Sequence, residues 1–131
     1  MTDLTLLRDC RRLFLRDMAV QARIGIHDFE LAQPQRLLIE VDLYVPLAAT
    51  SSARDRIEDV VDYDFIREVI LTRVAQGHIA LQETLCDDVL ARLLAHPGVR
   101  AARVATRKPD VYPDCDAVGV EVFGTQAGAG A

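Results

Sequence analysis

Four stretches of the chain alternate between hydrophobic and polar residues, and two more repeat hydrophobic residues at helical spacing. The alternation predicts β-strands at residues 13–24, 36–45, 99–107 and 118–123. The helical spacing predicts one helix between Asp62 and Gly77 and a second between Thr84 and Pro97. The order strand, strand, helix, helix, strand, strand indicates an α+β fold: a four-stranded antiparallel sheet with both helices on one face.

The strand at 36–45 has the clearest pattern, and the first strand is less regular. Residues on the apolar side of the clear strand are Leu37, Ile39, Val41, Leu43 and Val45. In the first strand, the apolar residues expected mostly on one side are Phe14, Met18, Val20, Ala22 and Ile24. Arg16 interrupts that series and predicts a bulge or an exposed strand end. Gly25 then permits a turn into a polar connection over residues 27–34.

The ends of the elements carry their own signals. Asp62 is the expected N-cap of the first helix and Gly77 its stop. Thr84 and Asp87 have the spacing of a capping box for the second helix. We expect residues 48–59 to form a loop with room for a short helical turn, the first ten residues to form an arm or a short strand, and residues 124–131 to form a disordered tail.

Composition narrows the class of protein. Half of the 131 residues are hydrophobic, which favours one folded domain over residues 1–123. The net charge of −5 argues against nucleic acid as a partner, because phosphate binding needs a basic face. No apolar run approaches membrane-spanning length, so no membrane partner is expected. Cys10, Cys86 and Cys115 lack a CxxC motif and suggest neither disulfides nor zinc; Cys86 falls on an apolar helix face, and a reducing cytoplasm fits best.

Long strands at the edges of so small a sheet need covering. Unpaired backbone groups at a sheet edge are a template for association, and natural proteins protect them. The chain has little sequence left over for this purpose. We therefore expect edge-to-edge assembly into a closed homo-oligomeric ring, with binding sites at the seams between copies.

Lys108 is the only lysine in a chain with 14 arginines, and it stands at the end of a predicted strand beside Pro109. Pro109 removes a ladder hydrogen bond and biases Lys108 away from a helix. An arginine stays charged at accessible pH, whereas a lysine in a tuned environment can exchange its proton. From this residue alone, a surface lysine at a strand end is the commoner interpretation.

Several short motifs, each weak alone, occur together and in order. They are Ile24-Gly25-Ile26-His27-Asp28-Phe29-Glu30, Pro34-Gln35, Val61-Asp62-Tyr63, Leu81-Gln82-Glu83-Thr84, Lys108-Pro109 and Val118-Gly119-Val120-Glu121. With these motifs and this order of elements, the chain resembles the dihydroneopterin aldolase family from about Leu13 to Phe123. The resemblance implies the tunnelling fold, in which small sheets assemble into an oligomeric barrel as tetrameric rings that commonly stack in pairs as octamers.

The resemblance also implies an activity. Members of this family split a side-chain carbon–carbon bond of 7,8-dihydroneopterin and release glycolaldehyde and 6-hydroxymethyl-7,8-dihydropterin, a folate precursor. The implied retro-aldol reaction uses no metal, no cofactor and no Schiff base, because the dihydropterin ring itself accepts the electrons. A small-molecule pterin is the expected partner.

Six residues match the site of the family. The resemblance places Leu81, Gln82 and Glu83 at the substrate, with the Glu83 carboxylate accepting from the paired N–H donors of the pterin edge. It makes Lys108 the catalytic lysine, as base or as orienting cation, with Glu30 as its charge partner. It makes Tyr63, reaching over from a neighbouring copy, the group that protonates the pterin intermediate. His27 varies in the family and stays outside this set.

The loop after Lys108 departs from the commoner form of the family. Small residues often follow Lys-Pro, whereas this chain has Asp110-Val111-Tyr112-Pro113-Asp114-Cys115-Asp116. The three aspartates do not have the spacing of a calcium loop. Two alternatives stay open: an epimerase acting on dihydroneopterin or its triphosphate, for which Arg36 and Arg107 are possible tail contacts, and a non-catalytic oligomer of the same fold.

Overall fold

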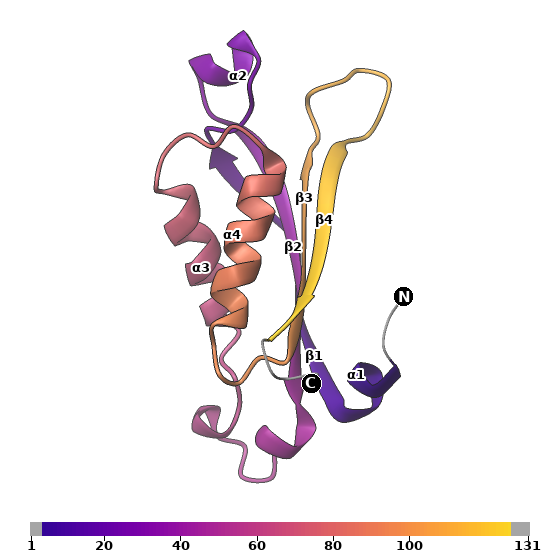
Figure 1. Ribbon diagram of the computed structural model, residues 1–131. Helices are drawn as coiled ribbons and strands as arrows, with labels where there is room; N and C mark the ends of the chain where they lie inside the picture. Colours follow the sequence, from indigo (N-terminus) through magenta and orange to yellow (C-terminus); the bar gives the residue numbers. More distant parts are fainter. Residues whose placement is uncertain (1–3, 127–131) are drawn as a thin grey trace.

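The computed structural model describes residues 4–126 and shows a four-stranded antiparallel sheet with two helices packed on one face (Figure 1). The sheet has the order β1-β2-β3-β4, made of β1 (Cys10–Ala22), β2 (Gln35–Pro46), β3 (Ala101–Lys108) and β4 (Val118–Thr125). The two helices on its face are α3 (Asp64–Val74) and α4 (Gln82–Leu94). Shorter elements are α1 (Leu4–Asp9), α2 (Asp28–Ala32), η1 (Leu47–Ala49) and η2 (Ile57–Asp59). The predicted α+β architecture is confirmed.

The core lies between the sheet and the two helices. The predicted apolar face of β2 is buried along its whole length, with exposures of 0–1% at Leu37, Ile39, Val41, Leu43 and Val45. Fully buried side chains of the helices meet it, namely Ile66 and Ile70 from α3 and Leu85, Val89 and Leu93 from α4. Cys86 is buried among them, as predicted, and burial raises the pKa of its thiol. No helix within residues 4–126 is long and apolar enough to cross a bilayer.

A bulge in β1 confirms one prediction and overturns another. Three residue steps of β1, from Leu15 to Met18, span only two steps of β2, and Asp17 has a φ of 53°. The extra residue reverses the alternation of core-facing and outward-facing side chains. Odd-numbered Leu13 and Leu15 therefore face the core before the bulge, and even-numbered Met18 faces it after the bulge. Phe14 therefore does not share a face with Met18, contrary to the prediction, and is 57% exposed.

One further prediction about local structure was wrong. The first residues form α1 rather than an arm or strand, because Leu6 packs against Cys10, Tyr44 and Ala101. The polar connection after Gly25 contains the single-turn helix α2, which was not predicted. The loop expected at 48–59 holds the short helical turns η1 and η2, as the predicted room for a helical turn allows.

The helix ends also differ from the expectation. α4 begins at Gln82 with Leu81 in extended conformation as its N-cap, so Thr84 and Asp87 form no capping box. Tyr63 occupies the N-cap of α3, although the Asp62 carboxylate accepts a hydrogen bond of 2.9 Å from the Asp64 amide. Of the predicted tail, Gly124 and Thr125 belong to β4, and the Gln126 amide donates to the Arg100 carbonyl oxygen at 2.8 Å. Residues 127–131 lie outside the described residues.

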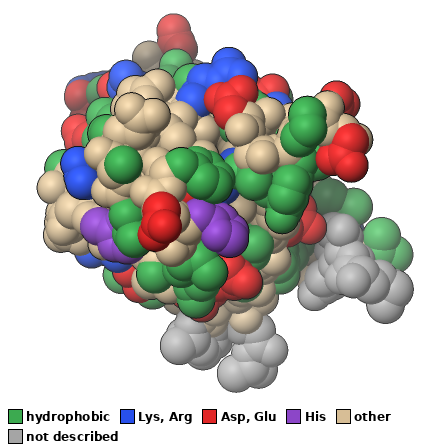
Figure 2. Space-filling model, turned by 90° about the horizontal axis from the view of Figure 1, so that it is seen from above, with side chains coloured by type: hydrophobic (Ala, Val, Ile, Leu, Met, Phe, Trp, Pro, Cys, Tyr) green, Lys and Arg blue, Asp and Glu red, His purple; other side chains and the backbone are tan. Residues whose placement is uncertain are grey.

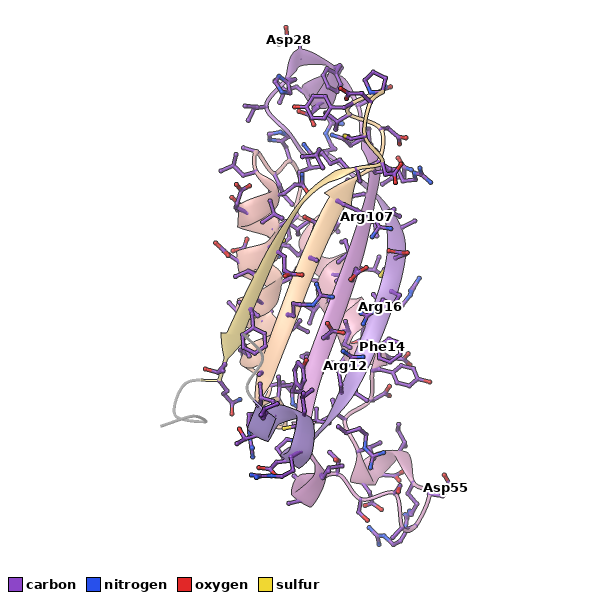
Figure 3. The ribbon with its side chains drawn as sticks, turned by 90° about the vertical axis from the view of Figure 1, so that its right-hand side faces the viewer. Arg12, Phe14, Arg16, Asp28, Asp55 and Arg107 are labelled. Carbon is purple, nitrogen blue, oxygen red and sulfur yellow. The ribbon has the colours of Figure 1, made fainter. Side chains whose placement is uncertain are left out.

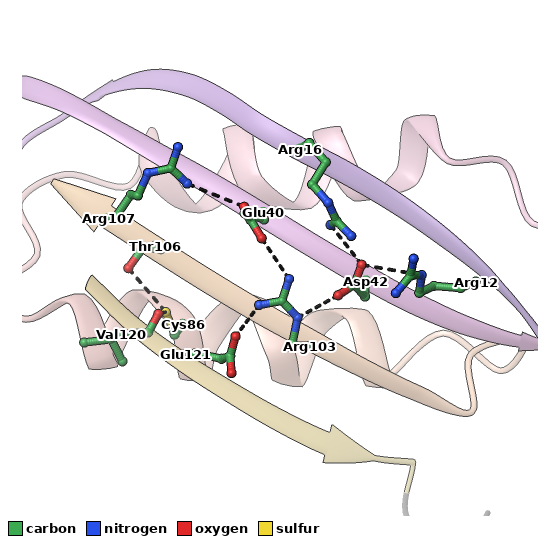
Figure 4. A network of polar contacts seen from close by, with 10 residues as sticks. All are labelled: Arg12, Arg16, Glu40, Asp42, Cys86, Arg103, Thr106, Arg107, Val120 and Glu121. Carbon is green, nitrogen blue, oxygen red and sulfur yellow. Dashed lines mark hydrogen bonds and ion pairs between the residues drawn. The ribbon is translucent and has the colours of Figure 1, made fainter. Parts of the chain in front are cut away.

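The face of the sheet without helices carries a network of ion pairs. Arg12, Phe14 and Arg16 lie along β1 and Arg107 on β3 on this face (Figure 3). At its centre Arg103 pairs with Glu40, Asp42 and Glu121, and Arg16 lies 2.9 Å from Asp42 (Figure 4). Burial of Asp42 opposes its ionisation, but these arginines outweigh the effect and lower its pKa. Charges on this face are thus mutually neutralised.

Several chain segments meet at one end of the sheet. Ile24, just after β1, forms a parallel bridge with Ile79, which precedes α4. The Gly25 amide donates to the Ile79 carbonyl oxygen at 2.9 Å, and the Ile79 amide to Arg23 at 2.8 Å. His78 Nε2 lies 2.9 Å from the Gly25 carbonyl oxygen. These bonds bring the start of α4 beside α2 and the β3–β4 loop, residues 109–117 (Figure 1).

Candidate active site

A buried ion pair forms the centre of this end of the molecule. Lys108 is the last residue of β3, and its Nζ lies 2.5 Å from Oε2 of Glu30 in α2. Lys108 is 9% exposed and Glu30 is 2% exposed. Lys108 lies on the helix-facing side of β3, whereas Arg107 points to the opposite face, where it pairs with Asp17 at 2.7 Å. The structure therefore separates the two neighbouring cations, as the strand period predicts.

The Glu30 carboxylate is fixed from three directions. Gln35 Nε2 donates to Glu30 Oε2 at 2.7 Å and also to the Ile24 carbonyl oxygen at 2.7 Å. The His27 amide donates to Glu30 Oε1 at 3.3 Å. Gly25 has a φ of 128°, and a Cβ built on it would lie 2.1 Å from Glu30 Cδ. The turn therefore requires glycine both for its conformation and for the space that the carboxylate fills.

These contacts determine the charge of Glu30. Burial raises the energy of a carboxylate, but the hydrogen bonds from Lys108, Gln35 and His27 outweigh it and lower the pKa from 4.5 to about 2. Glu30 is consequently ionised at neutral pH. It serves as an acceptor and counter-charge rather than as a proton donor.

The start of α4 supplies a second recognition surface. Thr106 Oγ1 donates to Gln82 Oε1 at 2.8 Å, and Gln82 Nε2 donates to the Val118 carbonyl oxygen at 3.3 Å, so the first residue of α4 is tied to β3 and β4. Glu83 is exposed in the first helical turn and has no ion pair within residues 4–126. The backbone amides of the first helical turn have no partner within the helix and point out of its N-terminal end. They therefore attract electron-rich groups of a ligand.

A hollow of about 170 Å³ joins the ion pair and the helix start. Five of the six predicted site residues line it, namely Glu30, Leu81, Gln82, Glu83 and Lys108. His27 and Tyr112 are also at its wall. Figure 2 shows this end of the molecule from outside, where hydrophobic, histidine and acidic side chains gather closely.

Tyr63 and the three loop aspartates lie elsewhere. Tyr63, at the start of α3, is 67% exposed and does not line the hollow. Asp110 lies 3.6 Å from Arg36. Asp114 and Asp116 do not line the hollow either. Within residues 4–126, no group of three or more His, Cys, Asp or Glu side chains is placed to hold a metal ion.

Gln35 and Thr106 were not among the predicted site residues, although a signal for both exists. Gln35 continues the buried series Leu37, Ile39 and Val41 of β2, and Thr106 shares the core-facing side of β3 with Lys108. A polar residue on a buried face needs a polar partner. The alternation of side chains along each strand thus indicates that both polar residues face the core, but it does not identify their hydrogen-bond partners.

Fold and site together define a class. The protein has a small antiparallel sheet backed by two helices, with a carboxylate-paired lysine and an uncapped helix start at one end of the sheet. This combination suits an enzyme that holds a small flat molecule by its polar edge and moves protons on it.

Comparison with known proteins identifies the family of this chain. The family model for dihydroneopterin aldolase matches residues 13–123, and the chain belongs to this family. A dihydroneopterin aldolase structure from Burkholderia thailandensis, bound to guanine, has 56% identity and a TM-score of 0.84, covering 92% of this chain and 94% of that one. A dihydroneopterin triphosphate 2'-epimerase from Pseudomonas aeruginosa is 27% identical, over 86% of this chain and 91% of the relative. A dihydroneopterin aldolase from Escherichia coli is 25% identical, over 82% and 88%.

Proposed function

We propose that the protein catalyses the retro-aldol cleavage of 7,8-dihydroneopterin to glycolaldehyde and 6-hydroxymethyl-7,8-dihydropterin. The observation that carries this proposal is the buried Lys108–Glu30 pair beside Glu83 in one hollow. The family of the chain supports it, as does the guanine bound by the Burkholderia relative, because guanine and pterins share a 2-aminopyrimidinone edge.

Glu83 and the start of α4 bind the heterocycle. Its exposed carboxylate offers two acceptor oxygens to the two neighbouring N–H donors of the pterin edge, a charge-assisted pairing. Backbone amides in the same turn are placed to donate to the carbonyl oxygen of the ring. The polar edge of the ring is thereby fixed, and the side chain of the substrate extends toward Lys108.

Lys108 and Glu30 act on the side chain. In the reaction a proton leaves the hydroxyl of the carbon that becomes the aldehyde, and the adjacent carbon–carbon bond breaks. Its electron pair forms a double bond to the ring carbon while the π electrons of the C=N bond of the ring move onto the nitrogen. Reprotonation of the remaining carbon gives the product. Because Glu30 stays ionised and lies 2.5 Å from Nζ, the pair supports an orienting ammonium that holds and polarises the hydroxyls.

Tyr63 is assigned to the reprotonation step from a neighbouring copy. Its exposure of 67% and its absence from the hollow of its own chain are compatible with service to another chain. A phenol can donate and recover a proton, which this step needs. The assignment requires a homo-oligomer in which the start of α3 of one copy meets the hollow of the next.

The Pseudomonas relative keeps a second candidate open, an epimerase for dihydroneopterin triphosphate. A triphosphate tail needs free cations near the hollow. Arg36 lies 3.6 Å from Asp110, and Arg107 is paired with Asp17 on the other face of the sheet. This charge arrangement favours an uncharged triol tail and therefore the aldolase.

The deciding experiment incubates the purified protein with 7,8-dihydroneopterin and, separately, with its triphosphate. Glycolaldehyde from the first substrate supports the aldolase. An isomer of either substrate without glycolaldehyde supports the epimerase, and no product from either contradicts both. As matched variants, Lys108→Met should lower kcat by roughly 10²–10⁴-fold, whereas Glu83→Gln should chiefly raise KM.

A further inference from the structure

The hollow has a polar floor and an apolar rim. Its charged and amide side chains are Glu30, Gln82, Glu83 and Lys108. Its rim carries large apolar residues that are unusually exposed: Ile26 at 62%, Leu81 at 48% and Tyr112 at 52%. Apolar side chains left open around a polar floor fit a flat ring whose edge bonds to the floor and whose faces contact the rim. Tyr112 is the aromatic member of this rim.

Tyr112 is held at the hollow by both ends of its loop. The β3–β4 loop leaves the sheet at Lys108, which is fixed by Glu30, and returns at Val118, whose carbonyl oxygen accepts from Gln82. Pro109 and Pro113 restrict the backbone on either side of Tyr112. The loop therefore has little freedom to carry Tyr112 away from Lys108 and Gln82, two of the side chains that form the floor.

Nothing in the described chain uses the Tyr112 side chain. Within residues 4–126 its ring pairs with no other aromatic ring, and its hydroxyl makes no hydrogen bond. By contrast, Tyr44 is buried and packs edge-on to Phe123 at 6.3 Å. A half-exposed aromatic ring without a structural partner, at the wall of a binding hollow, is available to a ligand.

We propose that Tyr112 is a binding residue for the heterocycle, with its ring stacked against one face of the pterin. This inference rests on the proposed function and deepens it: Glu83 fixes the edge of the ring and Tyr112 covers a face. The contact exists in both the ground state and the transition state, so it acts on KM and leaves kcat unchanged. The phenol hydroxyl takes no part, which separates Tyr112 from Tyr63.

The test is a series of three variants, Tyr112→Phe, Tyr112→Leu and Tyr112→Ala, assayed for kcat and KM with 7,8-dihydroneopterin. Tyr112→Phe should match the wild type, Tyr112→Leu should raise KM severalfold, and Tyr112→Ala should raise it roughly tenfold, at unchanged kcat. Binding of guanine, followed by calorimetry, should weaken in the same order. Because this binding needs no turnover, it tests Tyr112 even if the wild type fails to cleave dihydroneopterin.

Three results would overturn the inference. An unchanged KM and guanine affinity in Tyr112→Ala would show that the ring contacts no ligand. An equal loss in Tyr112→Phe would assign the effect to the hydroxyl. A changed oligomer mass, measured by light scattering on each variant, together with the loss of affinity would show that Tyr112 packs on a neighbouring copy instead.

Discussion

Glu30 shows how one buried charge is made tolerable at the residue scale. A carboxylate that is 2% exposed would be strongly destabilised alone. Lys108 supplies the opposite charge, and Gln35 and the His27 amide supply further hydrogen bonds. The same contacts orient the Lys108 ammonium toward the hollow. Stability and the proposed chemistry thus both depend on the ionised Glu30 carboxylate, and its titration can be followed by measuring stability against pH.

Replacing Glu30 by Gln should change how stability depends on pH. The pKa of Glu30 is lowered from 4.5 to about 2, so its contribution is fully present above pH 4.5 and is lost as the pH falls toward 2. The wild type should therefore lose more unfolding free energy than Glu30→Gln over this range. Urea unfolding at a series of pH values measures the difference between the two proteins. A difference that stays constant with pH would contradict the assigned charge pair.

At the scale of elements, the site depends on two joints: the turn between β1 and α2, and the docking of α4 onto β3 and β4. The first joint is Gly25, and the second is the bond from Thr106 to Gln82. Neither residue needs to touch the substrate. Each of them positions a group to which the proposed function assigns a substrate contact: Gly25 positions Glu30, and Thr106 positions Glu83 through Gln82.

Gly25→Ala and Gly77→Ala form a matched pair for the first joint. Both glycines have positive φ, 128° and 104°, so each substitution should cost more than about 1 kcal/mol of stability through backbone strain. Only the Cβ at position 25 would collide with Glu30, since nothing lies within 4 Å at position 77. We expect Gly25→Ala to lose activity far beyond its loss of stability and Gly77→Ala to keep its kcat. Comparable activity in both folded variants would argue against the role of the turn.

Thr106→Val tests the second joint. Valine keeps the shape of threonine but leaves the buried Gln82 Oε1 without its donor at 2.8 Å, which should cost about 1–3 kcal/mol. The start of α4 should then loosen, and KM should rise through Glu83. Thr106→Ser keeps the hydroxyl and should keep KM close to the wild-type value. Thermal unfolding and steady-state kinetics of both variants provide the comparison. Equal KM values in the two variants would show that the Thr106–Gln82 hydrogen bond does not affect substrate binding.

For the whole molecule, the open question is how the two sheet edges are covered. β1 and β4 each have one neighbour in the sheet, so both present an unpaired side. Association of β1 of one copy with β4 of the next would pair these edges and close a ring. The role proposed for Tyr63 places a further requirement on this assembly: the start of α3 of one copy must reach the site end of another.

Subunit complementation tests this assembly. Tyr63→Phe and Lys108→Met should each be nearly inactive alone. Co-expressed in equal amounts, they should recover about one quarter of the wild-type activity, because one arrangement in four joins an intact Lys108 to an intact Tyr63. If Tyr63 instead served its own chain, no hybrid site would be intact and activity would not return. Light scattering on the wild type adds a direct check, since a 14.5 kDa monomer would contradict the ring.

The sequence by itself determined the elements and their buried faces. Periods of two and 3.6 residues are local properties, so β2, β3 and both long helices followed from them. The bulge near Arg16 was also visible, but its effect on Phe14 was not, because a one-residue shift reverses every later side chain. The single lysine and the ordered motifs pointed to Lys108, Glu83 and Glu30.

Only the tertiary structure decided how these groups meet. Glu30 and Lys108 are 78 residues apart, and no local pattern encodes their 2.5 Å contact. It exists because the turn at Gly25 and the end of β3 lie at the same edge of the sheet. The beginnings of α1 and α4 were likewise set by packing of Leu6 and by the bonds of Gln82, which outweigh the weak propensities of short segments.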